Sequence, residues 1–101
     1  MKPNARRQIL FILFVFSGLL SVGNVNAQSV EDSLLNVANT SSDDSIVVHS
    51  YITLCDLKTY NDTKKAVEYA EKAIAIAEES KYYNGVAKGY ERLGNAYFQL
   101  G

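Results

Sequence analysis

The sequence predicts an all-α fold of antiparallel helix hairpins, preceded by a secretion signal. Apolar residues recur every three or four positions in three segments between residues 46 and 100. Clusters of turn-forming residues separate these segments, at 39–45, 59–62 and 81–85. The single proline, Pro3, lies near the N-terminus, so no proline interrupts an expected helix.

The first 27 residues have the layout of a signal peptide. Three basic residues precede a 14-residue apolar run, Ile9–Val22. Val25 and Ala27 are small residues placed for cleavage before Gln28. We therefore expect residues 1–27 to be removed and the mature protein to be exported. An uncleaved membrane anchor is the alternative, which the length disfavours because a spanning helix needs about 20 residues.

The composition of the mature part restricts the classes of molecule that are expected as partners. From Gln28 onward there are seven basic and eleven acidic side chains, a net charge of about −4 with His49 neutral. Nucleic acid is a poor match for such a surface, so we expect no nucleic acid partner. The only cysteine, Cys55, cannot form an internal disulfide, so stability must come from packing.

Residues 28–43 are expected to form a short helix followed by a polar linker. Ser29 is placed to cap this helix, and Asp32 follows three residues later. The linker at 39–45 holds Asp43 and Asp44, and either one is suited to cap the next helix.

Two further helices are expected next. The first covers 46–59 and ends at the turn TYND, residues 59–62. The second opens at Asp62 or Thr63 and runs to Ser80 without an internal glycine or proline. Small side chains at spacings i, i+4, i+7 and i+11 line one face of it: Ala66, Ala70, Ala73 and Ala77. Such a face lets another helix approach unusually closely.

A last helix is expected after KYYNG, where Asn84-Gly85 is a strong turn dipeptide. Its apolar positions alternate at spacings of four and three, which indicates an amphipathic helix. These positions are Val86, Tyr90, Leu93, Tyr97 and Leu100.

The segment Tyr90-x-x-Leu93-Gly94-x-x-Tyr97 resembles the first helix of a tetratricopeptide repeat (TPR), with tyrosine in place of the usual tryptophan. The preceding helix resembles the second helix of such a repeat, with Ala66, Ala70 and Ala73 at its contact positions. A shift back by 39 residues reveals a weaker copy of the same first helix. It places Tyr90 on Tyr51, Leu93 on Leu54, Gly94 on Cys55 and Tyr97 on Lys58.

The resemblance covers residues 44–101, about one and a half repeats of the roughly 40-residue type found in exported bacterial proteins. It implies a TPR-like α-α superhelix, in which Gly94 lacks a side chain so that the alanine face can approach. Arrays of this kind usually need about three copies, because each unit buries its face against the next. We therefore expect this chain to be the N-terminal part of a longer protein.

The candidate reactive residues have structural explanations. His49 has Ile52 and Thr53 as helical neighbours, so we expect it to face solvent without a ligand partner. Cys55 stands at the glycine-equivalent position, where a small packing residue is expected. The sequence contains no phosphate-binding glycine loop, metal-ligand spacing or catalytic triad. We therefore expect no catalytic residue, no cofactor and no metal, and this segment is classed as non-enzymatic.

Four tyrosines lie outside the apolar pattern: Tyr60, Tyr69, Tyr82 and Tyr83. One interpretation is that they line a surface for a partner, because tyrosine offers a large contact area with a polar end. The other, which is favoured, is that they pack between consecutive repeats.

Two function classes remain. The favoured one is a non-catalytic scaffold in the periplasm or another extracytoplasmic space, which presents a groove to a protein or peptide and stacks against further repeats of its own chain. The alternative is the sensor segment of a membrane-bound signalling enzyme, such as a sensor histidine kinase. Any membrane contact would then lie in a segment after Gly101.

Overall fold

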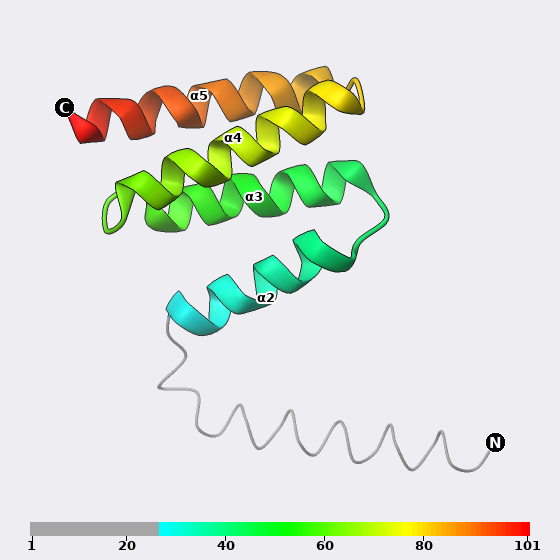
Figure 1. The fold of residues 1–101 in the computed structure, drawn as a ribbon, viewed down its shortest axis with the longest axis horizontal. Coiled ribbons are helices and arrows are strands. Elements are labelled where there is room, and N and C mark those ends of the chain that lie inside the picture. The colour runs from blue at the N-terminus through cyan, green and yellow to red at the C-terminus, as the bar shows by residue number, and fades with distance from the viewer. Residues whose placement is uncertain (1–26) are drawn as a thin grey trace, which may run out of the picture.

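The computed structural model describes residues 27–101, and nearly all of the expected signal peptide lies outside them. The described helices are α2 (Ala27–Thr40), α3 (Asp44–Lys58), α4 (Thr63–Glu79) and α5 (Tyr83–Leu100). Each helix packs against the one before it and runs in the opposite direction (Figure 1). The predicted all-α class of antiparallel hairpins is therefore confirmed.

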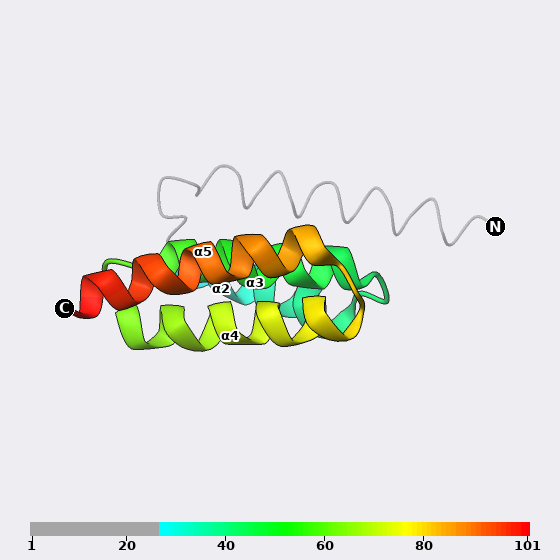
Figure 2. The ribbon, with the colours of Figure 1, turned by 90° about the horizontal axis from the view of Figure 1, so that it is seen from above.

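The helices form two layers, with α4 packed against both α3 and α5. Figure 2 shows α3 and α5 side by side in one layer, with α4 on the other side. Contact between α3 and α5 is direct, although a whole helix separates them in the sequence. Segments about 40 residues apart therefore meet along one face of the molecule.

Aspartates begin two of the helices, as the sequence predicts. The carboxylate of Asp43 accepts a hydrogen bond from the backbone N–H of Ser45 at 2.9 Å, and hydrogen bonds from Ser45 lower the pKa of Asp43. Asp62 accepts from the N–H of Lys65 at 3.3 Å. By contrast, α2 already begins at Ala27, so Ser29 lies inside the helix rather than at its N-cap.

The turn between α4 and α5 differs from the prediction. Asn84 and Gly85 lie inside the first turn of α5, and the chain reverses earlier, around Lys81. Lys81 has a φ of 59°, and the N–H of Tyr82 donates to the carbonyl of Ala77 at 2.8 Å. This six-to-one bond marks a Schellman motif, with lysine at the left-handed position that glycine usually occupies. The sequence signal missed it because lysine is not a turn former there.

The core is centred on the small-residue face of α4. All four alanines of the predicted stripe are completely buried: Ala66, Ala70, Ala73 and Ala77. The opposing surface of α3 contributes Val48, Leu54 and Cys55, which are also completely buried. Large side chains of one helix thus fill the space that the short side chains of the next helix leave.

Gly94 does not have the packing role that the sequence pattern predicted. A Cβ at Gly94 would meet nothing within 4 Å, because this residue lies on the exposed face of α5. The close approaches belong instead to Gly89, where a Cβ would lie 2.5 Å from Cγ1 of Ile74, and to Gly85, where it would lie 2.9 Å from Cγ1 of Val48. The expected contact of Gly94 with the alanine stripe is therefore wrong.

Replacing Gly89 or Gly94 of α5 by alanine should change the stability of the fold in opposite directions. Gly89→Ala should destabilise the fold, because overpacking costs about 1–3 kcal/mol and outweighs the gain in helix propensity of about 1 kcal/mol. Gly94→Ala should gain that propensity without a clash. Urea unfolding followed by circular dichroism measures both. Equal shifts of the two midpoints would mean that α5 does not approach α4 through Gly89.

Candidate functional site

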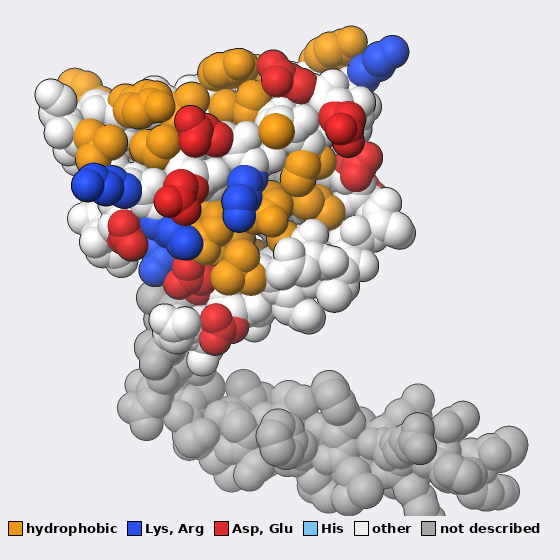
Figure 3. Space-filling model, viewed as in Figure 1, with side chains coloured by type: hydrophobic (Ala, Val, Ile, Leu, Met, Phe, Trp, Pro, Cys, Tyr) orange, Lys and Arg blue, Asp and Glu red, His pale blue; other side chains and the backbone are white. Residues whose placement is uncertain are grey.

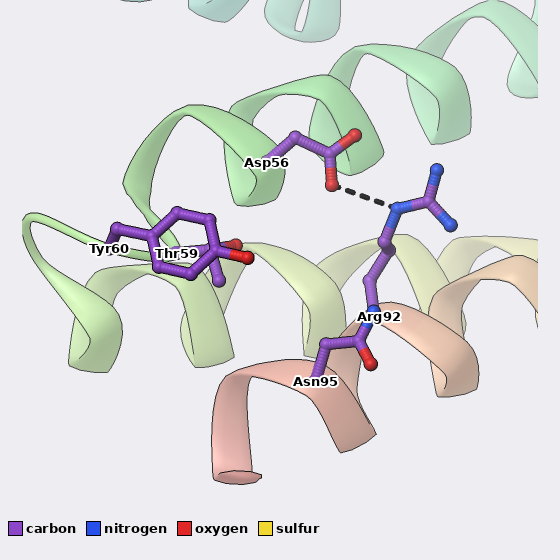
Figure 4. Close-up of a pocket in the computed structure, with 5 residues that line it drawn as sticks. All are labelled: Asp56, Thr59, Tyr60, Arg92 and Asn95. Carbon is purple, nitrogen blue, oxygen red and sulfur yellow. Dashed lines mark hydrogen bonds and ion pairs between the residues drawn. The ribbon is translucent and has the colours of Figure 1, made fainter. Parts of the chain in front are cut away.

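A groove of about 210 Å³ lies where α3 ends beside the C-terminal half of α5. We call it the α3–α5 groove. It is lined by Asp56, Thr59, Tyr60, Arg92 and Asn95. Figure 4 shows Tyr60 and Thr59 at one end of the groove, with Asp56 reaching toward Arg92 from the neighbouring helix. The groove thus exists only because α3 and α5 pack side by side.

An ion pair bridges the two helices at this groove. Nε of Arg92 donates to Oδ1 of Asp56 at 2.8 Å, and the Nη1 group of Arg92 pairs with Glu91. The hydrogen bond to Asp56 raises the pKa of the Arg92 guanidinium. One cation therefore stands between two carboxylates, of which only Asp56 lines the groove, and the charges of Asp56 and Arg92 offset each other there.

Two residues that line the groove are related by the 39-residue shift in the sequence. The shift relates Asp56 of α3 to Asn95 of α5, so equivalent positions of the two helices face the same space. Thr59 is buried and its hydroxyl donates to the carbonyl of Cys55 at 2.8 Å, which fixes this end of α3. Tyr60 follows directly and is 82% exposed, so its ring remains available to a ligand.

A second surface is the outer face of α5, which is apolar and exposed. We define it by the residues Tyr83, Ala87, Tyr90, Gly94, Tyr97 and Phe98. The four aromatic side chains are between 51% and 82% exposed. Hydrophobic side chains follow α5 along the upper edge of the molecule in Figure 3. None of these six residues carries a charge.

The corresponding face of α3 has a different environment. Tyr51, Leu54 and Cys55 are all buried, and the ring of Tyr51 stacks on Tyr69 of α4 with a centroid distance of 6.1 Å. Their equivalents in α5, by the 39-residue shift, are half-exposed Tyr90, partly buried Leu93 and exposed Gly94. The described residues contain no helix that covers α5 as α4 covers α3.

A buried ionic cluster attaches α2 to the other helices. Oε1 of Glu31 lies 2.9 Å from Nζ of Lys58 on α3, and Oε2 accepts a hydrogen bond from the hydroxyl of Tyr69 on α4 at 2.7 Å. The hydrogen bonds from Lys58 and Tyr69 lower the pKa of Glu31. Burial, followed by the bond to Glu31, raises the pKa of Tyr69.

The four tyrosines outside the apolar pattern have separate environments. Tyr69 is in the core, so the interpretation that it lines a partner surface is wrong for this residue. Tyr82 is partly buried against the core, and its hydroxyl lies 2.9 Å from Nε2 of exposed His49. Tyr60 and Tyr83 are exposed, the first in the α3–α5 groove and the second on the outer face of α5.

The remaining predicted site residues divide between core and surface. Cys55 is a free, buried thiol whose pKa is raised by burial. Among the residues singled out for packing, Tyr51, Leu54, Ala66, Ala70 and Ala73 are buried, Leu93 is partly buried, and Tyr90, Gly94 and Tyr97 are exposed. Residues 27–101 bring together no group of three metal-binding side chains. No helix within this range is long and apolar enough to cross a membrane.

Sequence reasoning missed the residues of the groove. Asp56, Arg92 and Asn95 were not singled out, because isolated charged and amide side chains on amphipathic helices usually face solvent. The signal that could have found them is the internal shift, which superposes Asp56 on Asn95 once the repeat is accepted.

Comparisons of this chain with protein-family models, with curated proteins and with solved structures found no match.

The Glu31 cluster predicts how stability depends on pH. A carboxylate with a lowered pKa contributes stability that is present above its ordinary pKa of 4.5 and is lost as the pH falls through its lower folded value. Glu31→Gln should therefore lower the free energy of unfolding by about 1–3 kcal/mol at pH 7, and by less at acid pH. Urea unfolding at several pH values measures this difference.

The matched control is Glu71→Gln, which removes an exposed carboxylate from α4. Its effect should be small at every pH. A cost of Glu31→Gln that stays constant between neutral and acid pH would show that the ion pair with Lys58 does not hold α2 in place.

Proposed function

We propose that this chain is the N-terminal part of an exported, non-catalytic repeat scaffold of the tetratricopeptide type, which mediates protein–protein interaction. The observation that carries the proposal is the exposed outer face of α5. Antiparallel hairpins with an alanine-lined second helix support the same assignment, as does the 39-residue internal shift between α3 and α5.

The size of the exposed face supports the proposal that a further helix packs on it. Four aromatic rings with total areas of 150–250 Å² each, exposed by half or more, leave on the order of 500 Å² of aromatic surface open. The largest apolar patches on soluble monomers are about 300–600 Å² and are often interaction sites. In α3, the equivalents of Ala87, Tyr90 and Gly94 are Val48, Tyr51 and Cys55, and these three are buried, whereas Asp44, the equivalent of Tyr83, is exposed. A helix in the place of α4 would bury the outer face of α5 in the same way.

The α3–α5 groove supplies the binding surface of the proposed scaffold. Its side chains come from helices of consecutive repeats, so every added repeat would lengthen the groove by an equivalent set of positions. An extended peptide fits such a surface because it can contact each repeat in turn. The proposal assigns these residues no reaction, cofactor or nucleic acid.

The proposal is tested by extending the chain through the residues encoded after Gly101. The extended protein should unfold at a higher urea concentration than residues 28–101, because the outer face of α5 becomes buried. Gly94→Leu is the informative variant. It should leave the short form at least as stable as before, since nothing lies within 4 Å of Gly94 and leucine favours a helix more than glycine does, and it should remove most of the gain from the extension.

Equal urea midpoints for the short and extended forms would contradict the proposal. So would a reading frame that stops at Gly101 in a chain that is monomeric and fully stable, because the outer face of α5 would then be an ordinary exposed surface.

Export makes a separate prediction. The mature N-terminus should be Gln28, because Val25 and Ala27 stand at the positions that signal peptidase reads. N-terminal sequencing or the intact mass of exported protein measures it. Recovery of a membrane-bound product that still begins with Met1 would contradict the proposed location.

A further inference from the structure

We propose that the α3–α5 groove binds a cationic side chain, lysine or arginine, carried by an extended peptide. The inference rests on the proposed scaffold function and adds the chemistry of the partner. It is drawn from the charges, the free hydrogen-bonding groups and the size of the groove.

The engagement of Arg92 favours a cation over an anion in the groove. Arg92 is already paired through Nε with Asp56 and through Nη1 with Glu91. Asp56 and Arg92 are the charged residues that line the groove, and their charges offset each other. A carboxylate ligand would have to compete with two carboxylates for Arg92, whereas an ammonium or guanidinium ligand can pair with the carboxylate oxygen of Asp56 that Arg92 leaves open.

The hydrogen-bonding groups of the groove point to the same chemistry. The ion pair and hydrogen bond of Asp56 within residues 27–101 both use Oδ1, so Oδ2 is available to accept from a ligand. Asn95 lines the same space and offers a second acceptor in its amide oxygen. A lysine ammonium or arginine guanidinium, which only donates, matches two acceptors.

Tyr60 supplies a contact that an anion would not use. Its ring stands at the end of the groove and is 82% exposed (Figure 4). A cation within about 6 Å of an aromatic ring is attracted to its face. The same chain already contains this arrangement twice, since Nζ of Lys65 and Nζ of Lys72 each lie 5.6 Å from the ring centroid of a tyrosine.

The volume and the overall charge restrict the partner further. A groove of 210 Å³ falls below the roughly 300–1,000 Å³ of pockets for drug-sized ligands, so it suits one side chain of a peptide that continues along the surface. Residues 28–101 carry a net charge of about −4, which attracts a basic partner from a distance. The partner is therefore a peptide segment with an exposed lysine or arginine.

The test is an NMR titration of the full chain, expressed in an exporting host and purified as that host processes it. The probes are three blocked tripeptides with glycine on both sides of lysine, norleucine or glutamate. The lysine peptide should shift the resonances of Asp56, Tyr60, Arg92 and Asn95 at millimolar concentration. The norleucine and glutamate peptides should bind at least several-fold more weakly. Added salt should weaken the binding of the lysine peptide.

Two variants and one control keep the result interpretable. Asp56→Asn should weaken the affinity for the lysine peptide about tenfold. Tyr60→Leu should weaken this affinity several-fold without disturbing the fold, because Tyr60 is 82% exposed. Glu71→Gln removes one exposed carboxylate of α4 away from the groove and should change nothing.

The possible outcomes separate this inference from the scaffold function. Equal binding of the lysine and glutamate peptides in the groove would overturn the preference for a cation and leave the groove a peptide site. No shift with any of the peptides, or an unchanged affinity in both Asp56→Asn and Tyr60→Leu, would overturn the inference entirely. The unfolding comparison of short and extended chains would still decide the scaffold proposal independently.

Discussion

The close approach of helices to the small-residue face of α4 is the constraint on which the rest of the structure depends. Its four alanines are completely buried, and α4 packs against the layer formed by α3 and α5 (Figure 2). A larger side chain in this stripe would push these helices away from α4. Because both helices rest on α4, residues 39 positions apart meet beside one another, and the α3–α5 groove follows from that meeting.

The two faces of α5 are built for different neighbours. On the inner face, Gly85 and Gly89 leave room for Val48 and Ile74, so α5 can lie close to the earlier helices. On the outer face, aromatic rings surround Gly94 and no described residue covers them. In α3 the equivalents of Ala87, Tyr90 and Gly94, which are Val48, Tyr51 and Cys55, are buried. The difference in exposure between α3 and α5 supports the proposed repeat scaffold.

Sequence periodicity predicted the helices and the alanine core well, because both depend on side-chain spacing within one element. It also offered Asp43 or Asp44 as a cap and placed the start of the next helix at Asp62 or Thr63, and the structure has Asp43 and Asp62 as the caps, since capping is a local interaction. It failed for Gly94, because periodicity does not tell which of two apolar faces meets which neighbour. The hydrogen bond of Tyr69 to Glu31 and the pairing of Asp56 with Arg92 join residues 36 or more positions apart, so no local pattern contained them.

Hydroxyl-radical footprinting of the intact protein from its native source tests the central claim most directly. Tyr51, Tyr69 and Tyr60 serve as internal references, since the first two are buried and the third is exposed. The account predicts that Tyr90 and Tyr97 react as slowly as the buried pair, because a further helix covers the outer face of α5. Reaction of Tyr90 and Tyr97 as fast as that of Tyr60 would contradict it.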